Sequence, residues 1–378
     1  MHNQSDERGQ VRTLHLIDSG GPGGAETVFS QLAAAAAQRG ENCGVVVPYD
    51  GWLAKRLRQL GIEPLIVPSK GSFAFGLAKF LWRQGRAERI QLMHVHLLGS
   101  AVYAAAVGVL LRCKVLAVFH GSTDLGESGA LVGIKRWLLQ RTHVSVVVVS
   151  QAVADALRDW GLDERRMTTI INGVDTMVYV PGRSDMLHQE LGLPASARIV
   201  GAVGNVRAAK AYDVFVRAAA RVVAARPEVH FVAAGQGTEA DIARLEALCV
   251  SLGVGSNVHF LGFRADGPKL YQSLDLFVSS ALSEGLPLSF LEAMACGRAI
   301  VATANEGAAK LLGDTGGGLL SPVGDAVALA DNITTLLDDR DQTERLGRAG
   351  RAAVERNFSL ATTIQQYREL IARIARPS

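Results

Sequence analysis

The sequence predicts an α/β protein of two domains, each a doubly wound parallel sheet of the Rossmann type. Its 378 residues exceed what one hydrophobic core usually serves, which favours two domains. Short apolar runs alternate with amphipathic stretches along the chain, as in consecutive βαβ units. Hydrophobic residues make up 48% of the chain and aromatic ones only 6%, which suits aliphatic strands buried on both faces.

The first half contains six apolar runs separated by helical segments, beginning at Val11. Six or seven parallel strands are expected here. The predicted strands are VRTLHLI, CGVVVP, PLIVP, IQLMHVH, KVLAVFHG and VSVVVVS, and the predicted helices cover about 25–39, 52–60, 75–89, 101–111 and 134–141.

A domain boundary is expected at Pro181, where an extended stretch precedes a fresh strand. The second half repeats the pattern with strands ARIVGAVG, VHFVAAG, NVHFLGF, DLFVSS and RAIVAT and helices over 239–252, 289–296 and 325–337. The predicted domains are 1–181, joined by a returning C-terminal helix over 358–378, and 182–357. Two such domains facing each other across a cleft would bind a ligand beyond the carboxyl ends of their strands.

Charge, cysteine usage and the lengths of the apolar runs argue against several classes of protein. A formal net charge of +3 provides no large basic field, so nucleic acid is not an expected partner. Cys43, Cys113, Cys249 and Cys296 have no paired spacing, which favours reduced thiols and a cytoplasmic location. The polar N-terminus has no secretory apolar region, and the longest apolar run, 101–111, is too short to span a bilayer. We expect a soluble protein, peripheral to a membrane at most.

The first predicted strand ends in DSGGPGGAE, a glycine-rich loop that leads into a helix near Ala25. Gly23 and Gly24 would let the backbone approach an anion at the positive end of the helix dipole, although a tight turn alone is the alternative. No G-x-G-x-x-G register fits, and no acidic residue directly follows Val47 to bind a ribose. A nicotinamide-dependent dehydrogenase is therefore disfavoured.

Three histidines are predicted at strand ends of the first half. His94 and His96 lie in MHVHL, where structural roles are at least as expected as binding, and a metal site lacks a third ligand nearby. His120 closes VLAVFHG and is the stronger candidate for contacting a sugar hydroxyl or a leaving phosphate.

Loops of the second half carry cations and glycines after predicted strands. Arg207 and Lys210 lie three residues apart between a strand and a helix, a placement that suits a diphosphate, with a solvated basic turn as the alternative. Gly235 follows the next strand, and Phe263 ends NVHFLGF, where backbone groups could border a base.

The strongest signal is SSALSEGLPLSFLEAMACG, in which Glu284 and Glu292 are eight residues apart. Carboxylates accept hydrogen bonds from vicinal diols such as those of ribose or a sugar. The helix predicted here would expose amides at Gly285, Leu286 and Leu288 at its N-terminus. Because apolar residues surround Glu292, its carboxylate requires a partner.

At these residues the sequence resembles glycosyltransferase family 4 of the GT-B fold, which is marked by an E-x7-E motif. The resemblance covers nearly the whole chain, because GGAE, FHG, VSQAV, NGVD and FLGF also occur in the family's order. It implies a retaining transferase that moves a sugar from a nucleotide-sugar donor, UDP- or GDP-linked, to an acceptor. No separate cofactor and no metal are implied.

The resemblance also implies roles for individual residues. Glu292 would hold the ribose hydroxyls, and Glu284 with the amides after it would hold the donor sugar. Arg207 and Lys210 would neutralise the diphosphate, against which Gly23 and Gly24 would lie. His120 would contact the donor sugar, and the segment containing Phe263 would border the base. The chain departs from the family pattern at Asn205, where Arg is commonest, and at Ala211, where Gly is usual.

The expected mechanism is front-face displacement, because no pair of carboxylates marks a retaining hydrolase. Lys210, Arg207 and the amides near Gly285 would stabilise the departing diphosphate. A GT-B epimerase or phosphorylase is one alternative, and a subunit that only binds nucleotide is another. The donor sugar, base and acceptor stay open, although Phe, Trp and basic residues over 73–89 suit peripheral membrane contact and a lipid-linked acceptor.

Overall fold

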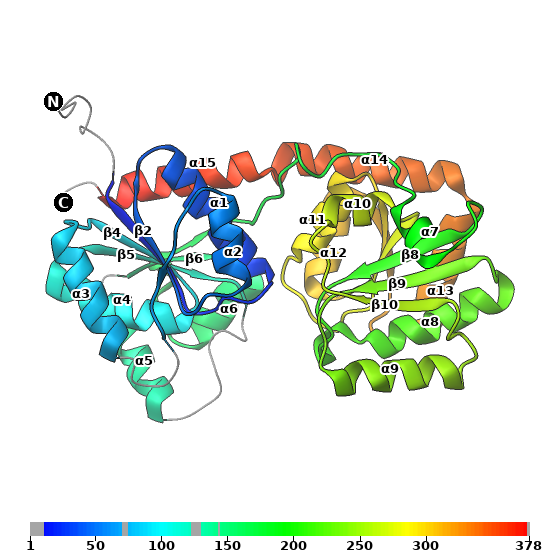
Figure 1. Cartoon of the computed structure of the whole chain (residues 1–378), viewed down its shortest axis with the longest axis horizontal. Helices are drawn as coiled ribbons and strands as arrows, with labels where there is room; N and C mark the ends of the chain where they lie inside the picture. The colour runs from blue at the N-terminus through cyan, green and yellow to red at the C-terminus, as the bar shows by residue number, and fades with distance from the viewer. Residues whose placement is uncertain (1–10, 70–74, 122–129, 143, 376–378) are drawn as a thin grey trace. The chain divides into compact units, whose positions relative to one another are not determined.

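The computed structural model describes residues 11–69, 75–121, 130–142 and 144–375. The chain folds into two compact units, each a parallel sheet covered by helices (Figure 1). Unit 1 comprises Met1–Ile171 and Thr363–Ser378, and unit 2 comprises Asn172–Thr362. The predicted class, an α/β protein with two doubly wound sheets, is confirmed.

Unit 1 contains a seven-stranded sheet in the order β3-β2-β1-β4-β5-β6-β7. Its strands are β1 (Thr13–Ile17), β2 (Asn42–Val47), β3 (Leu65–Ile66), β4 (Leu92–His96), β5 (Lys114–Phe119), β6 (Val144–Val148) and β7 (Met167–Thr169). The strand order changes direction between β1 and β4, which is the topological switch point of such a sheet.

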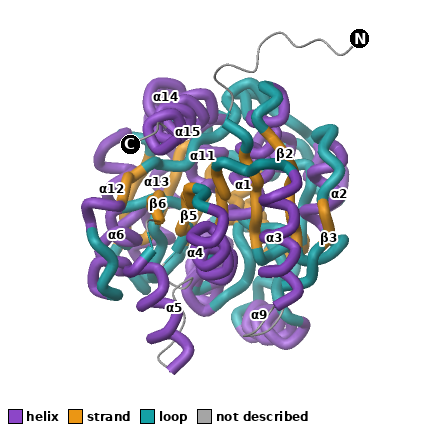
Figure 2. Tube along the Cα trace, turned by 90° about the vertical axis from the view of Figure 1, so that its left-hand side faces the viewer, coloured by secondary structure: helices purple, strands orange, loops and turns teal. Residues whose placement is uncertain are grey.

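The helices of unit 1 lie on both faces of this sheet. They are α1 (Gly24–Gln38), α2 (Trp52–Gln59), α3 (Phe75–Ala87), α4 (Leu98–Leu111), α5 (Ala130–Arg141), α6 (Gln151–Asp159) and, from the end of the chain, α15 (Leu360–Ala375). Right-handed crossovers place α1 and α2 on one face and α3 to α6 on the other. Figure 2 shows α3 and α4 side by side in front of the strands.

Helix α15 is fastened to the first unit although it follows the second in sequence. Thr363 Oγ1 donates a hydrogen bond to the Ile171 carbonyl at 3.0 Å, and Tyr367 and Leu370 are buried. The last turns of the chain therefore complete the core of unit 1.

Unit 2 contains a six-stranded parallel sheet in the order β10-β9-β8-β11-β12-β13. Its strands are β8 (Arg198–Val203), β9 (Val229–Ala234), β10 (Val258–Gly262), β11 (Leu276–Ser279), β12 (Ala299–Thr303) and β13 (Gly318–Ser321). Sequence patterns predicted only five of these strands. They missed β13 because GLLS is short, begins with glycine and is only partly buried at the sheet edge.

Eight helices of the described chain belong to unit 2. They are α7 (Met186–Leu191), α8 (Tyr212–Ala225), α9 (Glu239–Ser251), α10 (Gly267–Gln272), α11 (Leu288–Ala295), α12 (Glu306–Thr315), α13 (Ala326–Asp338) and α14 (Arg340–Asn357). The hydrophobic core on one face of the sheet includes α8, α9 and α13, and the core on the other includes α10, α11 and α12. The central strands are thus covered on both sides, as their aliphatic composition requires.

Candidate functional site

The carboxyl edge of the unit 2 sheet gathers most of the residues predicted from sequence. Arg207 and Lys210 follow β8, Gly235 follows β9, Phe263 follows β10, and Glu284 follows β11. Since β10, β9, β8 and β11 are consecutive parallel neighbours, the loops after them line one edge of the sheet. This edge is the candidate donor site.

The backbone around Lys210 is held from two sides. Residues Ala208–Lys210 form a short 3-10 turn, and the Ser280 hydroxyl donates to the Lys210 carbonyl at 2.9 Å. The Leu282 amide donates to the Ala209 carbonyl at 2.8 Å. These bonds tie the loop after β8 to the loop after β11, and the Lys210 ammonium forms an ion pair with the Glu284 carboxylate.

The ion pair between Lys210 and Glu284 is shielded from solvent. The Glu284 side chain is 9% exposed, and its second oxygen, Oε2, has no hydrogen-bond partner among the described residues. Burial, with the nearby charge of Arg207, lowers the pKa of Lys210 to about 8, while the Glu284 carboxylate opposes that change by favouring the ammonium form. The site therefore holds one neutralised cation and one buried acceptor without a partner.

Gly235 allows two neighbouring strand ends to approach closely. A Cβ atom there would lie 2.0 Å from the Gly204 carbonyl oxygen. The Gly235 amide donates to the Gly262 carbonyl at 2.8 Å, which joins the ends of β9 and β10. Asn205, where the family usually has Arg, accepts a hydrogen bond from the Gln236 amide at 3.0 Å and so braces the same loops.

Glu292 projects from α11 toward two tyrosines. The Tyr271 hydroxyl of α10 donates to Glu292 Oε2 at 2.7 Å. Burial raises the pKa of Glu292, and hydrogen bonds from the Tyr271 and Tyr179 side chains counteract that rise. The partner that sequence reasoning required for this carboxylate is thus a phenol, not a cation.

Helix α11 begins at Leu288, one residue before the predicted range of 289–296. Pro287 precedes its first residue, Leu288, so Gly285 and Leu286 lie in the preceding loop. The Gly285 carbonyl lies against Gly307, where an added Cβ would be 1.7 Å from its oxygen. Of the three amides predicted at the helix N-terminus, those of Gly285 and Leu286 are therefore loop amides, because Pro287 sets the start of the helix.

The glycine loop of unit 1 is lined by polar and aromatic side chains. Gly23 caps α1, and Gly24 is its first residue. The Glu26 carboxylate bonds to the Ser19 hydroxyl and folds back to Gly23, where a Cβ would be 2.4 Å from its Oε2. A negative group from the chain itself therefore lies at the start of α1.

Four histidine rings form a continuous row inside unit 1. His15 on β1, His94 and His96 on β4, and His120 after β5 have successive ring centroids 5.1, 5.0 and 5.0 Å apart. His96 Nδ1 lies 2.8 Å from His120 Nε2. Desolvation is the main cause that lowers the pKa of each ring, to about 4 for His15 and His120. All four are therefore neutral at pH 7.

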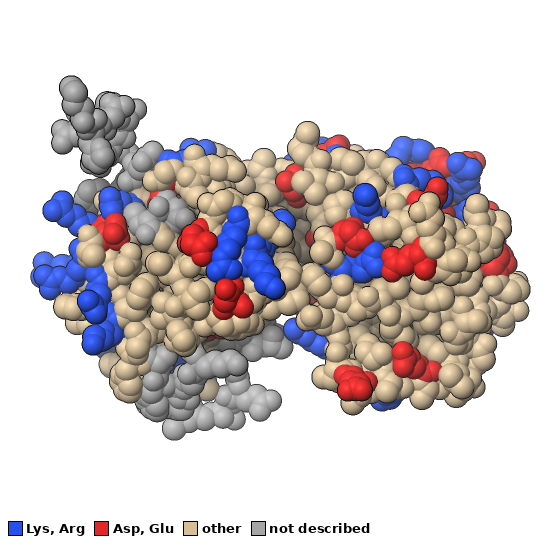
Figure 3. Space-filling view, in the orientation of Figure 1, with Lys and Arg blue, Asp and Glu red and all other residues tan. Residues whose placement is uncertain are grey.

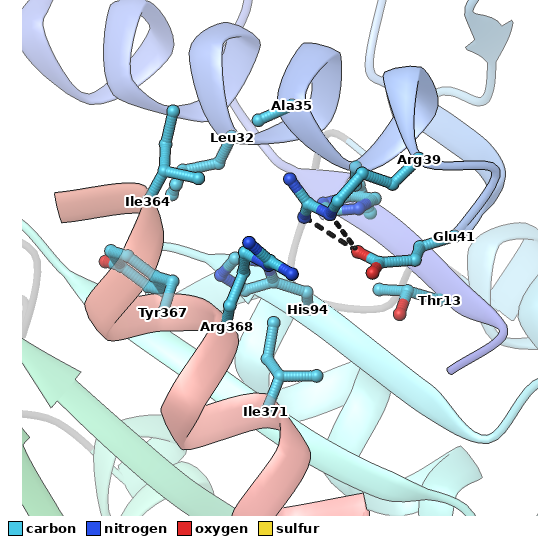
Figure 4. Close-up of a pocket in the computed structure, with 12 residues that line it drawn as sticks. Thr13, Leu32, Ala35, Arg39, Glu41, His94, Ile364, Tyr367, Arg368 and Ile371 are labelled. Atoms are coloured by element: carbon cyan, nitrogen blue, oxygen red, sulfur yellow. Dashed lines mark hydrogen bonds and ion pairs between the residues drawn. The ribbon is translucent and has the colours of Figure 1, made fainter. Parts of the chain in front are cut away.

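His94 does not lie at a strand end, which corrects the prediction from sequence. It is central in β4 and 1% exposed, and its ring contacts Tyr367 of α15 with centroids 5.4 Å apart. A cavity of about 20 Å³ beside it has room for about one water molecule. Figure 4 shows Tyr367 and Arg368 of α15 on one side of it and the ion pair of Arg39 and Glu41 on the other.

Two family models cover most of the chain. The model described as Glycosyltransferase Family 4 matches residues 22–178, and the one described as Glycosyl transferases group 1 matches residues 184–353. The chain belongs to the family 4 glycosyltransferases of the GT-B fold.

Named relatives of this glycosyltransferase use different substrates. The lipopolysaccharide core biosynthesis mannosyltransferase LpsB of Rhizobium meliloti is 28% identical over 83% of this chain and 88% of its own length. The N-acetyl-alpha-D-glucosaminyl L-malate synthase of Bacillus anthracis is 26% identical over 91% of this chain and 92% of its own length. Among solved structures, Anabaena HepE in complex with UDP and glucose is 25% identical, covers 96% of this chain and all of its own, and has a TM-score of 0.84.

The sheet order of unit 2 brings several of the predicted residues of this glycosyltransferase together. Lys210 and Glu284 are in contact, and Arg207, Gly235 and Phe263 belong to loops at the same sheet edge. Gly23, Gly24 and His120 belong to unit 1.

Sequence reasoning about this glycosyltransferase missed the aromatic residues that support the site. Tyr271 lies eleven residues after Phe260 in a stretch with no motif of its own, and Tyr49 packs its ring against Gly20. Within the described ranges, no group of three or more His, Cys, Asp or Glu side chains could hold a metal ion, and no helix is long and apolar enough to cross a membrane.

Proposed function

We propose that this glycosyltransferase uses a nucleotide-sugar donor, UDP-linked before GDP-linked, and retains the anomeric configuration. The observation that carries the proposal is the contact of Lys210 with Glu284 at the carboxyl edge of unit 2, beside Arg207. Two cations and a buried carboxylate at one sheet edge suit a diphosphate joined to a hydroxyl-rich sugar. The resemblance to HepE, which was solved with UDP and glucose, supports UDP as the carrier.

The residues of unit 2 take separate parts of the donor in this proposal. Lys210 and Arg207 neutralise the diphosphate, and Glu284 accepts hydrogen bonds from the sugar with its partnerless Oε2. Glu292 accepts from the ribose diol. The amides of Gly285, Leu286 and Leu288 donate to the sugar and diphosphate, and the loops of Gly235 and Phe263 border the nucleotide.

Unit 1 contributes the acceptor side in the same proposal. The neutral His120 ring contacts the donor sugar, in an orientation that its bond to His96 restricts. Gly23 and Gly24 lie against the diphosphate and the acceptor. Because Glu26 already faces Gly23, binding of an anion there requires this carboxylate to turn away.

Transfer then proceeds on one face of the sugar. The bond between the anomeric carbon and the diphosphate oxygen breaks, the acceptor oxygen bonds to the same carbon from the same side, and the departing diphosphate takes the acceptor proton. Lys210, Arg207 and the loop amides stabilise the charge that develops on the diphosphate. Catalysis consists of positioning and electrostatic stabilisation.

A screen of donors tests this function. UDP-, GDP-, ADP- and dTDP-sugars are added singly, and the melting temperature and slow nucleotide release are measured. A ligand that binds only the folded state raises its stability. Selective stabilisation with nucleotide release by one donor is the expected result; no response to any of them contradicts the proposal.

We also propose that the acceptor is a glycan or a lipid-linked glycan, reached from the cytoplasmic face of a membrane. Exposed apolar side chains on the α3–α5 face of unit 1 support this: Trp82, Val109, Leu110, Ile134 and Trp137. The described residues between 75 and 141 include nine Lys and Arg but only one acidic residue, Glu88. In Figure 3 basic side chains gather at the edge of unit 1 where α3 lies. Residues 73 and 74 of the predicted segment lie outside the described chain.

Vesicle binding tests the membrane proposal. Co-sedimentation is measured with zwitterionic vesicles and with vesicles containing an anionic lipid, because basic side chains favour the latter. Replacing Arg83 and Arg86 by Glu should abolish binding, whereas the same change at Arg340 and Arg348 on α14 should not. No wild-type binding to anionic vesicles contradicts the proposal.

A further inference from the structure

Glu292 is held by phenol groups from outside its own helix. Tyr271 comes from α10 and donates to Glu292 Oε2 at 2.7 Å, and the Tyr179 side chain hydrogen-bonds the same carboxylate. The rings of Tyr179 and Tyr271 meet edge to face with centroids 5.9 Å apart. A carboxylate and two tyrosines thus form one compact cluster.

Packing around the cluster leaves little freedom to either tyrosine. Tyr271 is 1% exposed, and its ring packs against Phe277, with centroids 6.0 Å apart. A Cβ on Gly267 would lie 2.9 Å from the Tyr179 hydroxyl. The two phenol groups therefore have fixed positions before any ligand arrives.

Arg351 of α14 joins the backbone of Tyr179 to the helix that carries Glu292. Its Nη1 donates to the Tyr179 carbonyl and to the Ala295 carbonyl, both at 2.6 Å. Ala295 is the last residue of α11. The segment that carries Tyr179 and the helix that carries Glu292 are thus held by the same guanidinium.

The arrangement divides the hydrogen-bonding capacity of the carboxylate. An ionised carboxylate accepts about four hydrogen bonds over its two oxygens. The phenols use part of this capacity from the protein side, and Glu292 as a residue keeps part of its surface exposed. The remaining lone pairs suit a pair of hydroxyl donors such as a vicinal diol.

We propose that Tyr271, assisted by Tyr179, is a positioning residue that orients the Glu292 carboxylate for the 2′,3′-diol of the donor ribose. This inference rests on the proposed function, since it assumes that a nucleotide binds at Glu292. It assigns to the two tyrosines the selection of a ribonucleotide over a 2′-deoxyribonucleotide.

The phenols also favour the ionised form of the carboxylate. Burial raises the pKa of Glu292, and the hydrogen bonds from Tyr271 and Tyr179 lower it. Cys296, which follows α11 directly, stays neutral because burial raises its pKa to about 12, and Arg351 is engaged by carbonyls and by Glu355. Loss of the Tyr271 hydroxyl should therefore raise the pKa of Glu292 further, so that protonation weakens nucleotide binding as the pH falls.

The test compares dissociation constants of UDP and 2′-deoxy-UDP for the full-length protein. The wild type should prefer UDP by about tenfold or more. Tyr271→Phe, which keeps the ring, should weaken UDP binding by about tenfold, leave 2′-deoxy-UDP binding within about twofold, and lose more UDP affinity between pH 8 and pH 6 than the wild type does. With the full donor, KM should rise while kcat stays within about twofold.

Two further variants separate positioning from general stability. Tyr367→Phe removes a buried phenol hydroxyl from unit 1 and should leave all of these values unchanged. Tyr271→Phe should add no loss to a chain that already carries Glu292→Gln, because both changes remove one recognition unit.

The outcomes distinguish the two levels of the proposal. If the wild type binds no nucleotide, the proposed function fails and this inference fails with it. If the wild type prefers UDP but Tyr271→Phe shows the same preference and the same pH profile, the inference alone is overturned. Equal weakening of UDP and 2′-deoxy-UDP by Tyr271→Phe also overturns it, because that result indicates a purely structural role.

Discussion

At the scale of single residues, sugar transfer in the proposed site depends on Lys210. Its ammonium forms an ion pair with Glu284 and would meet the charge that grows on the departing diphosphate. Removing one preorganised donor of this kind usually lowers turnover by about 100- to 1,000-fold. We predict such a fall in kcat for Lys210→Ala, with the donor KM changed only a few-fold. Lys310→Ala, at an exposed lysine of the same unit, is the control; equal losses in binding and turnover would contradict the assignment.

Replacing Glu284 should lower turnover but strengthen the binding of the product UDP. In the unliganded structure its carboxylate neutralises Lys210, so a diphosphate must compete with it for that cation. Glu284→Gln removes the negative charge at nearly constant volume. We predict that UDP binds about tenfold more tightly, a gain of about 1.4 kcal/mol, while sugar transfer is lost. Titration calorimetry with UDP checks this; Glu246→Gln on α9 should change nothing, and weaker UDP binding by Glu284→Gln would refute the competition.

Some residues of the candidate site could be predicted from the sequence, and others could not. Glu284, Lys210 and His120 were recognisable because each follows a strand within a family motif. Tyr271 and Tyr179 were not, because their importance depends on a contact between segments far apart in the chain. The pairing of Lys210 with Glu284 was likewise invisible, since 74 positions separate the two residues and only the sheet order brings their loops together.

At the scale of secondary-structure elements, the C-terminal end of α4 has a strained backbone conformation. Arg112 ends α4 in the left-handed region, with φ of 55°. Such a conformation costs a non-glycine residue about 1 to 2 kcal/mol. Because Arg112 is exposed, Arg112→Gly loses no buried contact and should stabilise unit 1 by up to about 1 kcal/mol.

Denaturant unfolding measures the effect of Arg112→Gly. Arg141→Gly serves as the comparison, since it places glycine inside the last turn of α5 and should destabilise by about 1 kcal/mol. A lower free energy of unfolding for Arg112→Gly would contradict this prediction. It would mean that the Arg112 side chain stabilises unit 1 by more than the left-handed backbone conformation destabilises it.

Elements with regular aliphatic patterns were predictable, and those that pack through small residues were not. The buried strands and α13 agree with the predicted ranges to within a few residues. Helix α14 was missed because its buried residues are Gly347, Gly350, Ala353 and Val354, a narrow stripe in a polar sequence. A Cβ on Gly347 would lie 2.3 Å from the Gly297 carbonyl oxygen, so this packing needs glycine and leaves no hydrophobic signal.

At the scale of the whole molecule, the histidine row should make unit 1 sensitive to acid. The folded pKa of His15, His94, His96 and His120 is lowered, so the unfolded chain binds more protons below its own pKa of about 6.5. Stability is therefore fully present above about pH 6.5 and is lost as the pH falls toward the folded values, by up to about 1.4 kcal/mol per histidine per pH unit.

Urea unfolding at pH 7.5 and pH 5.5 checks the sign of this dependence. Arg39, Glu41 and Arg368 line the cavity beside His15 and His94. His94→Phe, next to Tyr367, should reduce the difference between the two pH values. A stability that is unchanged or higher at pH 5.5 would contradict the assignment of neutral, buried rings.

The domain limits at Pro181 and the division into a donor and an acceptor domain stay predictions. The compact units of the structure divide the chain at Ile171 and Thr363. Sequence patterns could predict two sheets and a returning C-terminal helix because each has a repeated hydrophobic period. They could not predict the loop contacts that decide the donor sugar.

Hydrogen exchange with and without the donor found by the screen shows whether the nucleotide sugar binds at the carboxyl edge of unit 2. Protection is expected there, in 204–211, 235–238, 281–288 and the first turns of α11, with little change along the amino-terminal ends of β8 to β13. Protection of these segments in the wild type would support the proposed site. Unchanged exchange there, with protection elsewhere in the chain, would contradict it.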